Sequence, residues 1–247
     1  MRLARLLLVA VCVFSPVAAS AADGAVLVFG GTGRLGAPIV KLLLQAGEDV
    51  TVFARKDSSK ERLAGLDVDY VVGDLTDEKS IAAAFDTKKF RVVIDAAAQR
   101  GESSRIDKFY ETIARSMMTH AKRTGVRQFV LHGSIGAGDN LKEVPALKDF
   151  KATAGMIDKG LAERVVIESG VPYTIIRNGL FPQDPQPPAT ERAFLTPDVT
   201  TFGEVTRDDL AIFTLDVMDN PARLNKIYHA IDPTLKLRVD ETRRRAR

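Results

Sequence analysis

The chain has 247 residues, 45% of them hydrophobic and 27% charged, which is the composition of a globular protein with one or two domains and excludes disordered and collagen-like chains. Its formal charge of +3 depends on six arginines, at positions 2, 5, 243, 244, 245 and 247. Without them, 29 basic residues stand against 32 acidic ones, so the body of the chain is slightly acidic. The charge therefore gives no support for a nucleic-acid partner.

Residues 1–22 have the pattern of a targeting segment. Two arginines precede a short apolar run, and a proline and several small residues follow it, with Ala19 and Ala21 at the spacing of a cleavage site. The apolar run is shorter than the roughly 20 residues that span a bilayer. We therefore expect a cleaved signal peptide and export to a periplasmic or secretory compartment. The alternative is a membrane anchor formed by residues 6–22.

The predicted strands and helices alternate along residues 24–232. The strands are expected at 25–29, 49–53, 68–72, 91–96, 128–132, 173–177 and 226–230, and the helices at 34–46, 77–85, 104–124, 152–169 and 207–218. This alternation predicts an α/β fold with a doubly wound parallel sheet, in a single domain with a small C-terminal substrate-side region. A proline-rich loop at 182–188 follows the sixth strand. Residues 233–247 form a basic tail that we expect to be solvated.

Cysteine and histidine are too sparse for several kinds of site. Cys12 is the only cysteine and lies within residues 1–22, so the mature chain would have no disulfide and no thiolate. The histidines His120, His132 and His229 are far apart and show no ligand spacing, so we expect no metal site. We expect His132 to be a hydrogen-bonded residue at a strand end rather than a base.

A glycine-rich loop joins the first predicted strand to the first predicted helix. It reads Gly30-Gly31-Thr32-Gly33-Arg34-Leu35-Gly36. In this context the first glycines permit a tight turn, Gly33 lets the backbone approach a pyrophosphate at the helix N-terminus, and Gly36 lets the helix pack close to the strand. We therefore expect a Rossmann-type dinucleotide site formed by Gly30, Thr32, Gly33, Arg34, Leu35 and Gly36. The alternative is a structural turn without a ligand.

The end of the second predicted strand indicates which dinucleotide is bound. An NAD site has Asp or Glu there to bind the ribose 2′-hydroxyl, but this strand ends in Phe53-Ala54-Arg55-Lys56. Arg55 and Lys56 can pair with a 2′-phosphate, so NADP(H) is favoured over NAD(H). The alternative is that both are solvated loop charges.

Asp74 follows the third predicted strand, in Gly73-Asp74-Leu75. Its carboxylate can accept a hydrogen bond from the adenine amino group, or it can cap the helix predicted at 77–85. The two roles are compatible with each other.

These residues resemble the atypical short-chain dehydrogenase/reductase family, in particular its NAD(P)H-binding, NmrA-like branch. Further matching stretches are Val72-Gly73-Asp74-Leu75-Thr76-Asp77, Asp95-Ala96-Ala97-Ala98, His132-Gly133-Ser134, Lys159-x-x-x-Glu163 and the run from Ser169 to Gly179. The family usually has Arg-Pro-Gly where this chain has Arg177-Asn178-Gly179. The resemblance implies that Leu75, Ala96, Ala97 and Ala98 line the cofactor site and that Asn178 lies near the nicotinamide.

Reductases of the wider family use a Ser, a Tyr and a Lys, with the Tyr four residues before the Lys. In this chain Gly155 stands four residues before Lys159, and none of the four tyrosines has a lysine at that spacing. Ser134 and Lys159 remain as candidate catalytic residues. Lys159 would bind the nicotinamide ribose, or it is an exposed helix charge paired with Glu163. Ser134 would contact substrate, or it only ends a strand.

The resemblance implies an NADPH-dependent reductase of a small carbonyl, quinone or flavin-like acceptor. With no tyrosine in place, water would protonate the acceptor after hydride transfer. The missing tyrosine by itself favours a different class of protein, a non-catalytic NAD(P)-binding sensor or assembly partner.

Overall fold

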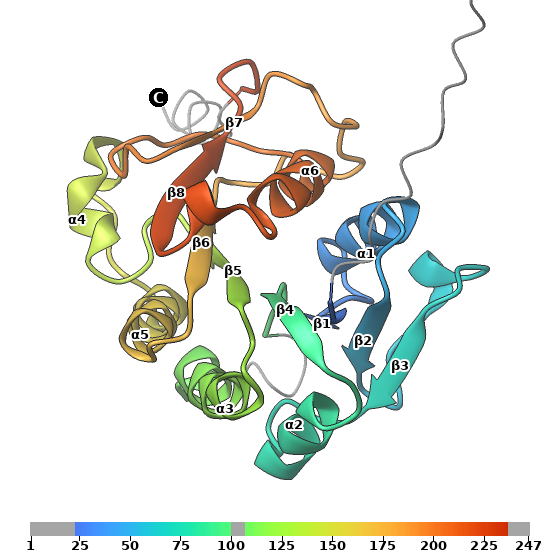
Figure 1. Cartoon of the computed structure of the whole chain (residues 1–247). Helices are drawn as coiled ribbons and strands as arrows, with labels where there is room; N and C mark the ends of the chain where they lie inside the picture. The colour runs from blue at the N-terminus through green and yellow to red at the C-terminus, as the bar shows by residue number, and fades with distance from the viewer. Residues whose placement is uncertain (1–22, 100–106, 237–247) are drawn as a thin grey trace, which may run out of the picture.

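The computed structural model describes residues 23–99 and 107–236. The predicted signal segment at 1–22, the first residues of the helix predicted at 104–124 and most of the basic tail lie outside these ranges. The described residues form one eight-stranded sheet with helices on both faces (Figure 1). This architecture confirms the predicted α/β fold with a Rossmann-type doubly wound sheet.

The strands are β1 (Ala25–Phe29), β2 (Val50–Ala54), β3 (Asp69–Val72), β4 (Phe90–Asp95), β5 (Gln128–Ser134), β6 (Tyr173–Asn178), β7 (Phe194–Thr196) and β8 (Lys226–Ile231). Their order across the sheet is β3-β2-β1-β4-β5-β6-β8-β7, and all neighbours are parallel except β7, which pairs antiparallel with β8. All seven predicted strands are present. Strand β7 is not predicted from the sequence, because three residues after a proline-rich loop are too few to form a pattern.

The helices are α1 (Gly36–Gln45), α2 (Glu78–Phe85), α3 (Phe109–Thr124), α4 (Asn140–Glu143), α5 (Ala154–Glu168) and α6 (Arg207–Val217), with short 3-10 helices η1 (Glu61–Leu63), η3 (Pro145–Leu147) and η4 (Pro221–Arg223). Helices α2, α3 and α5 cover one face of the sheet, and α1 and α6 cover the other (Figure 1). Because both faces are covered, every residue of β1 and β4 is buried. Within 23–99 and 107–236, no helix combines the length and apolar character needed to cross a bilayer.

Most of the longer helices have a side chain that binds the free N–H groups of the first turn. Asp77, Thr153 and Thr206 cap α2, α5 and α6. For α3 this role falls to Asp158 of α5, whose carboxylate accepts two backbone N–H groups at 2.8 and 2.9 Å. Among the described residues, no side chain caps α1, which begins at Gly36 and not at 34 as predicted. In its first turn, backbone carbonyls take the place of a side-chain cap, because the amides of Ala37 and Ile39 donate to Gly33 and Leu35 at 3.0 and 3.5 Å.

The connections place a crevice at the middle of the sheet. From β1 the chain moves outward to β2 and β3, and it then returns to the other side of β1 to form β4. The carboxyl ends of β1 and β4 are thus the point where the direction of winding reverses. In doubly wound sheets this is where ligands bind.

Candidate functional site

A cleft with a volume of about 610 Å³ lies at the carboxyl ends of β1, β2, β4, β5 and β6. This volume is within the range of about 300–1,000 Å³ found for small-molecule and cofactor sites. The predicted cofactor residues that line it are Gly30, Thr32, Gly33, Arg34, Leu35, Arg55, Asp74, Leu75, Ala96, Ala97, Ala98 and Asn178. The fold thus brings together predicted residues from five separate stretches of the sequence.

Two predicted cofactor residues, Gly36 and Lys56, are not part of the cleft lining. Gly36 instead serves packing, because a Cβ atom there would lie 2.2 Å from the carbonyl oxygen of Gly30. Lys56 is exposed beyond the end of β2. For Lys56 this placement agrees with the alternative of a solvated loop charge.

The glycine loop brings the end of β1 against the end of β4. Gly30 has a φ of +74°, and a Cβ atom on it would lie 2.7 Å from the backbone of Ala96 and Ala97. The turn is closed by a hydrogen bond of 2.9 Å from the amide of Gly33 to the carbonyl of Gly30. Only glycine combines this conformation with this close approach. The loop and the uncapped start of α1 therefore fit a pyrophosphate, which needs backbone N–H groups and a close approach.

Basic residues line the part of the cleft beyond β2. Arg55 lies there with Ser58 and Arg62, of which Arg62 belongs to η1. The guanidinium of Arg55 is half exposed, with its Nε 3.6 Å from a carboxylate oxygen of Asp57. These cationic and hydroxyl groups suit a phosphate. Ser58 and Arg62 are not among the predicted site residues, although both follow Arg55 within seven residues.

Asp74 shapes its own loop. Its Oδ1 accepts hydrogen bonds of 2.8 Å from both the amide and the hydroxyl of Thr76. The cap of α2 is Asp77, which accepts from the amide of Lys79 at 3.0 Å. The expectation that Asp74 caps this helix is therefore wrong, because the chain makes a turn between Asp74 and the first helical residue. Asp74 still lines the cleft.

Lys159 reaches the cleft from α5 and is largely buried. Its Nζ lies 5.2 Å from the centre of the Tyr110 ring. Burial lowers the pKa of Lys159, and the nearby carboxylates of Asp95 and Glu163 oppose this effect. The alternative of an exposed helix charge is therefore wrong, because Lys159 points inward against the end of β4.

Glu163 pairs with Arg177 and not with Lys159. Arg177 Nη2 lies 2.8 Å from Glu163 Oε2, and both side chains are buried. Burial raises the pKa of Glu163, and the guanidinium of Arg177 counteracts this. Gly133 leaves room for the pair, since a Cβ atom there would lie 2.6 Å from Glu163 Oε1. This buried ion pair between Glu163 and Arg177 lies beside Lys159.

Neither Ser134 nor position 155, where the wider family has its catalytic tyrosine and this chain has glycine, supplies a hydroxyl to the described cleft. The hydroxyl of Ser134 donates to the carbonyl of Ile135 at 3.3 Å, and Ser134 does not line the cleft. This placement agrees with a residue that only ends a strand. Gly155 is exposed, and a Cβ atom on it would meet nothing within 4 Å.

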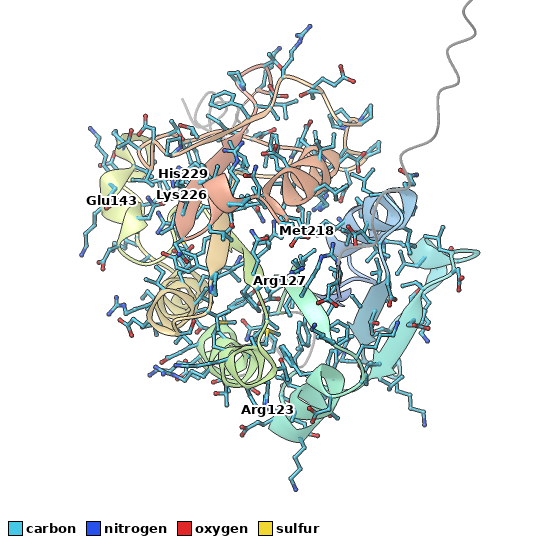
Figure 2. The ribbon with its side chains drawn as sticks, in the orientation of Figure 1. Arg123, Arg127, Glu143, Met218, Lys226 and His229 are labelled. Carbon is cyan, nitrogen blue, oxygen red and sulfur yellow. The ribbon has the colours of Figure 1, made fainter. Side chains whose placement is uncertain are left out.

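Of the three histidines, only His132 lines the cleft. Burial lowers its pKa to about 4, and both ring nitrogens have hydrogen-bond partners. His120 belongs to α3, and His229 lies on β8 toward α4, where its Nδ1 donates to the carbonyl of Thr201 at 2.9 Å (Figure 2). Within the described ranges, no three His, Cys, Asp or Glu side chains are grouped as a metal would require.

Three further lining residues were not among the predicted site residues, although two of them belong to predicted helices. Phe109 begins α3, Phe181 follows β6, and Arg207 begins α6. The guanidinium of Arg207 lies 4.2 Å from the centre of the Phe181 ring. Arg207 also contacts Asp184 of the proline-rich loop, with 3.5 Å between Nη1 and Oδ1. Phe109 and Phe181 thus give this side of the cleft an apolar surface, and the guanidinium of Arg207 lies against it.

The comparisons with known proteins agree with this site. A family model described as NAD(P)H-binding matches residues 30–221. The probable pinoresinol-lariciresinol reductase 3 of Arabidopsis thaliana is 28% identical over 223 residues, which are 84% of this chain and 67% of that protein. Sterol demethylase protein B of Methylococcus capsulatus is 35% identical over 113 residues, 45% of this chain and 34% of that protein. The chain thus spans between one third and two thirds of the length of these relatives.

A solved structure described as ChuY, an anaerobillin reductase from Escherichia coli O157:H7, has the same fold. It superposes with a TM-score of 0.70 at 25% sequence identity, covering 86% of this chain and 99% of that one. The structure and the comparisons confirm the resemblance drawn from the motifs. The chain belongs to the NAD(P)H-binding family of atypical short-chain dehydrogenases/reductases, and it is thereby a member of an oxidoreductase family.

Proposed function

We propose that this protein is an NADPH-dependent reductase of a small, electron-poor carbonyl, quinone or flavin-like acceptor. The observation that carries the proposal is the single cleft in which the glycine loop, a basic end and a buried lysine meet. Relatives named for the reduction of pinoresinol and lariciresinol and of anaerobillin support a reductase.

Residues at the start of α1 and in the loop before it would hold the pyrophosphate of the cofactor, namely Gly30, Thr32, Gly33, Arg34 and Leu35. Arg55, Ser58 and Arg62 would hold a 2′-phosphate, and their charge-assisted hydrogen bonds would favour NADPH over NADH. Asp74 and Leu75 would contact the adenine, and Ala96, Ala97 and Ala98 would contact the ribose side.

The proposed reaction takes place at the end of the cleft formed by Lys159 and Asn178. When bound, the cofactor supplies a hydride to the acceptor. Phe109 and Phe181 provide apolar surface for that acceptor. The ammonium group of Lys159 stabilises the negative charge that develops on the acceptor as the hydride arrives. Water supplies the proton, because no tyrosine stands four residues before Lys159.

The first experiment measures binding and turnover in the same preparation. We expect NADPH to bind more tightly than NADH in a fluorescence titration, and we expect some members of a panel of quinones, aldehydes and flavins to oxidise it. Lys159→Met keeps the length of the side chain and removes its charge, so it should lower kcat by about a hundredfold. Lys142→Met is the matched control, because Lys142 is exposed and pairs only with Asp139 among the described contacts.

The outcomes separate the two classes of function. Binding of NADPH without oxidation by any acceptor would overturn the reductase and support the non-catalytic sensor or assembly partner. Equal kcat for the wild type and Lys159→Met would remove the role given to Lys159.

We also propose that residues 1–22 direct export, with a membrane anchor at residues 6–22 as the alternative. The proposal rests on the arginines, the short apolar run and the small residues of this segment. Cell fractionation with N-terminal sequencing tests it, with a mature chain expected to start near Ala22. Intact Met1 on protein recovered from the cytosol would contradict export.

A further inference from the structure

A buried chain of hydrogen bonds ends at the predicted nicotinamide side of the cleft. His132 on β5 lies between Thr214 on α6 and Asn178 on β6. Its Nε2 is 3.0 Å from the hydroxyl oxygen of Thr214, and its Nδ1 is 3.2 Å from Oδ1 of Asn178. All three residues are buried, and both His132 and Asn178 line the cleft.

The hydroxyl of Thr214 determines where the histidine proton lies. A hydroxyl has one hydrogen, and Thr214 donates it to the carbonyl of Leu210 at 2.7 Å. Toward His132 the Thr214 oxygen can then only accept. Nε2 of His132 must therefore carry a hydrogen and donate it to Thr214.

Nδ1 of His132 is then an acceptor, because the ring is neutral. His132 is only 7% exposed, and among the described contacts its hydrogen-bond partners are a hydroxyl and an amide, with no carboxylate to stabilise a charged ring. Burial lowers its pKa to about 4, which agrees with a neutral ring near pH 7. A neutral imidazole has one N–H group, and Nε2 already holds it.

Asn178 satisfies this acceptor only with its NH₂ group. An amide oxygen facing Nδ1 would place two acceptors against each other, and a half-turn of the amide exchanges Oδ1 and Nδ2 at the same site. In that orientation Nδ2 donates to His132, and Oδ1 faces away from the ring. Asn178 lines the cleft, and the amide oxygen turned away from His132 is the acceptor that its side chain can offer to a ligand there.

We infer that the amide oxygen of Asn178 accepts a hydrogen bond from the carboxamide NH₂ group of the nicotinamide, and that His132 and Thr214 are positioning residues that fix this orientation. The inference rests on the proposed NADPH function. The backbone of Asn178 is also held, because its carbonyl accepts from the amide of Ile135 at 3.0 Å. The family pattern usually has proline at this position, which has no side-chain amide, so this hydrogen bond would depend on the asparagine of this chain.

The test compares ligands that differ only at the nicotinamide end. NADP⁺ has the carboxamide, its 3-acetylpyridine analogue keeps the carbonyl but lacks the NH₂ group, and adenosine 2′,5′-bisphosphate lacks the whole ring. Isothermal titration of the full chain gives the affinity for each. We expect the wild type to bind the acetyl analogue about fivefold to tenfold more weakly than NADP⁺, as the loss of one hydrogen bond implies.

Three variants each remove one side chain from the series of hydrogen bonds. Asn178→Ala should bind NADP⁺ and the acetyl analogue equally, because the acceptor is gone. His132→Phe keeps a planar ring, Thr214→Val keeps the side-chain volume, and both should lose most of the discrimination. All three should bind adenosine 2′,5′-bisphosphate as the wild type does, which shows that each variant is folded.

Each result bears on a different claim. If the wild type does not discriminate the acetyl analogue, or if Asn178→Ala discriminates as the wild type does, the inference is overturned while the cofactor proposal stands. If neither NADP⁺ nor adenosine 2′,5′-bisphosphate binds the wild type, the proposed function itself fails. A variant that loses the bisphosphate together with NADP⁺ assigns its residue a purely structural role and overturns the positioning role given to it.

Discussion

The carboxylate of Asp184 pairs with the guanidinium of Arg34 and so joins the proline-rich loop to the glycine loop. The same carboxylate contacts Arg207, and both arginines line the cleft. The carboxylate of Asp184 thus pairs with two arginines that would otherwise be available to bind a phosphate of the cofactor. Binding has to break or share these contacts.

Asp184→Asn should therefore strengthen the binding of NADPH. The effect is modest, because Arg34 and Asp184 are 45% and 52% exposed, and pairs of this kind contribute within about 1 kcal/mol, or up to about fivefold in Kd. Fluorescence titration at low salt measures it, and added salt should reduce the difference. Asp216→Asn is the matched control, since it removes an exposed pair with Arg223 outside the cleft lining. Weaker binding by Asp184→Asn would mean that Asp184 orients Arg34 for the cofactor.

The basic end of the cleft makes a separate prediction about cofactor choice. Arg55→Ala or Arg62→Ala should weaken NADPH binding by about tenfold to a hundredfold, as the loss of a charge-assisted hydrogen bond implies, and leave NADH binding unchanged. Lys56→Ala should change neither, because Lys56 lies outside the lining. Titration of each variant with both dinucleotides checks this. An equal loss of affinity for NADPH and NADH would show that these arginines do not bind the 2′-phosphate.

Much of this fold could be predicted because its signals are local. Apolar runs of strand length mark seven strands, and the glycine loop marks the start of α1 within two residues. Asp77 and Thr206 are ordinary helix caps at the expected starts of α2 and α6. Each of these features depends on neighbours within a few positions, so the sequence alone contains it.

The parts that could not be predicted depend on packing between distant segments. The spacing of Lys159 and Glu163 suggested a pair on a helix surface, but Arg177 on β6 binds Glu163, and Lys159 enters the cleft. Arg207 reaches the cleft because α6, at whose start it lies, packs on the same face of the sheet as α1. No pattern among neighbouring residues of the sequence predicts such contacts between distant segments.

The close contact beneath the glycine loop predicts a large loss of stability. A Cβ atom at Gly36 would lie 2.2 Å from the carbonyl oxygen of Gly30, which is backbone and cannot move aside cheaply. Gly36→Ala should lower the free energy of unfolding by about 1–3 kcal/mol or more and weaken NADPH binding. Gly155→Ala is the control, because a Cβ atom there meets nothing within 4 Å and alanine favours a helix by about 0.5–1 kcal/mol. Urea unfolding measures both, and a Gly36→Ala protein as stable as the wild type would contradict the packing role.

Asp95, at the end of β4, should make stability depend on pH. It is 5% exposed, and burial raises its pKa to about 6 from an ordinary value of 3.8, although the amide of Ala97 and the charge of Lys159 act in the opposite direction. A carboxyl group with a higher pKa in the folded state binds its proton more tightly there. Its contribution to stability is therefore greatest below the unfolded pKa and is lost as the pH rises through about 6.

Asp95→Asn removes this titration and keeps an oxygen that can accept the hydrogen bond of 2.9 Å from the amide of Ala97. Relative to the wild type, the variant should gain stability between pH 4 and pH 7, by about 3 kcal/mol for a shift of this size. Urea unfolding of both proteins at several pH values gives the difference directly. A difference that stays constant over this range would show that Asp95 has an ordinary pKa, and a difference that falls with pH would show that Lys159 outweighs burial.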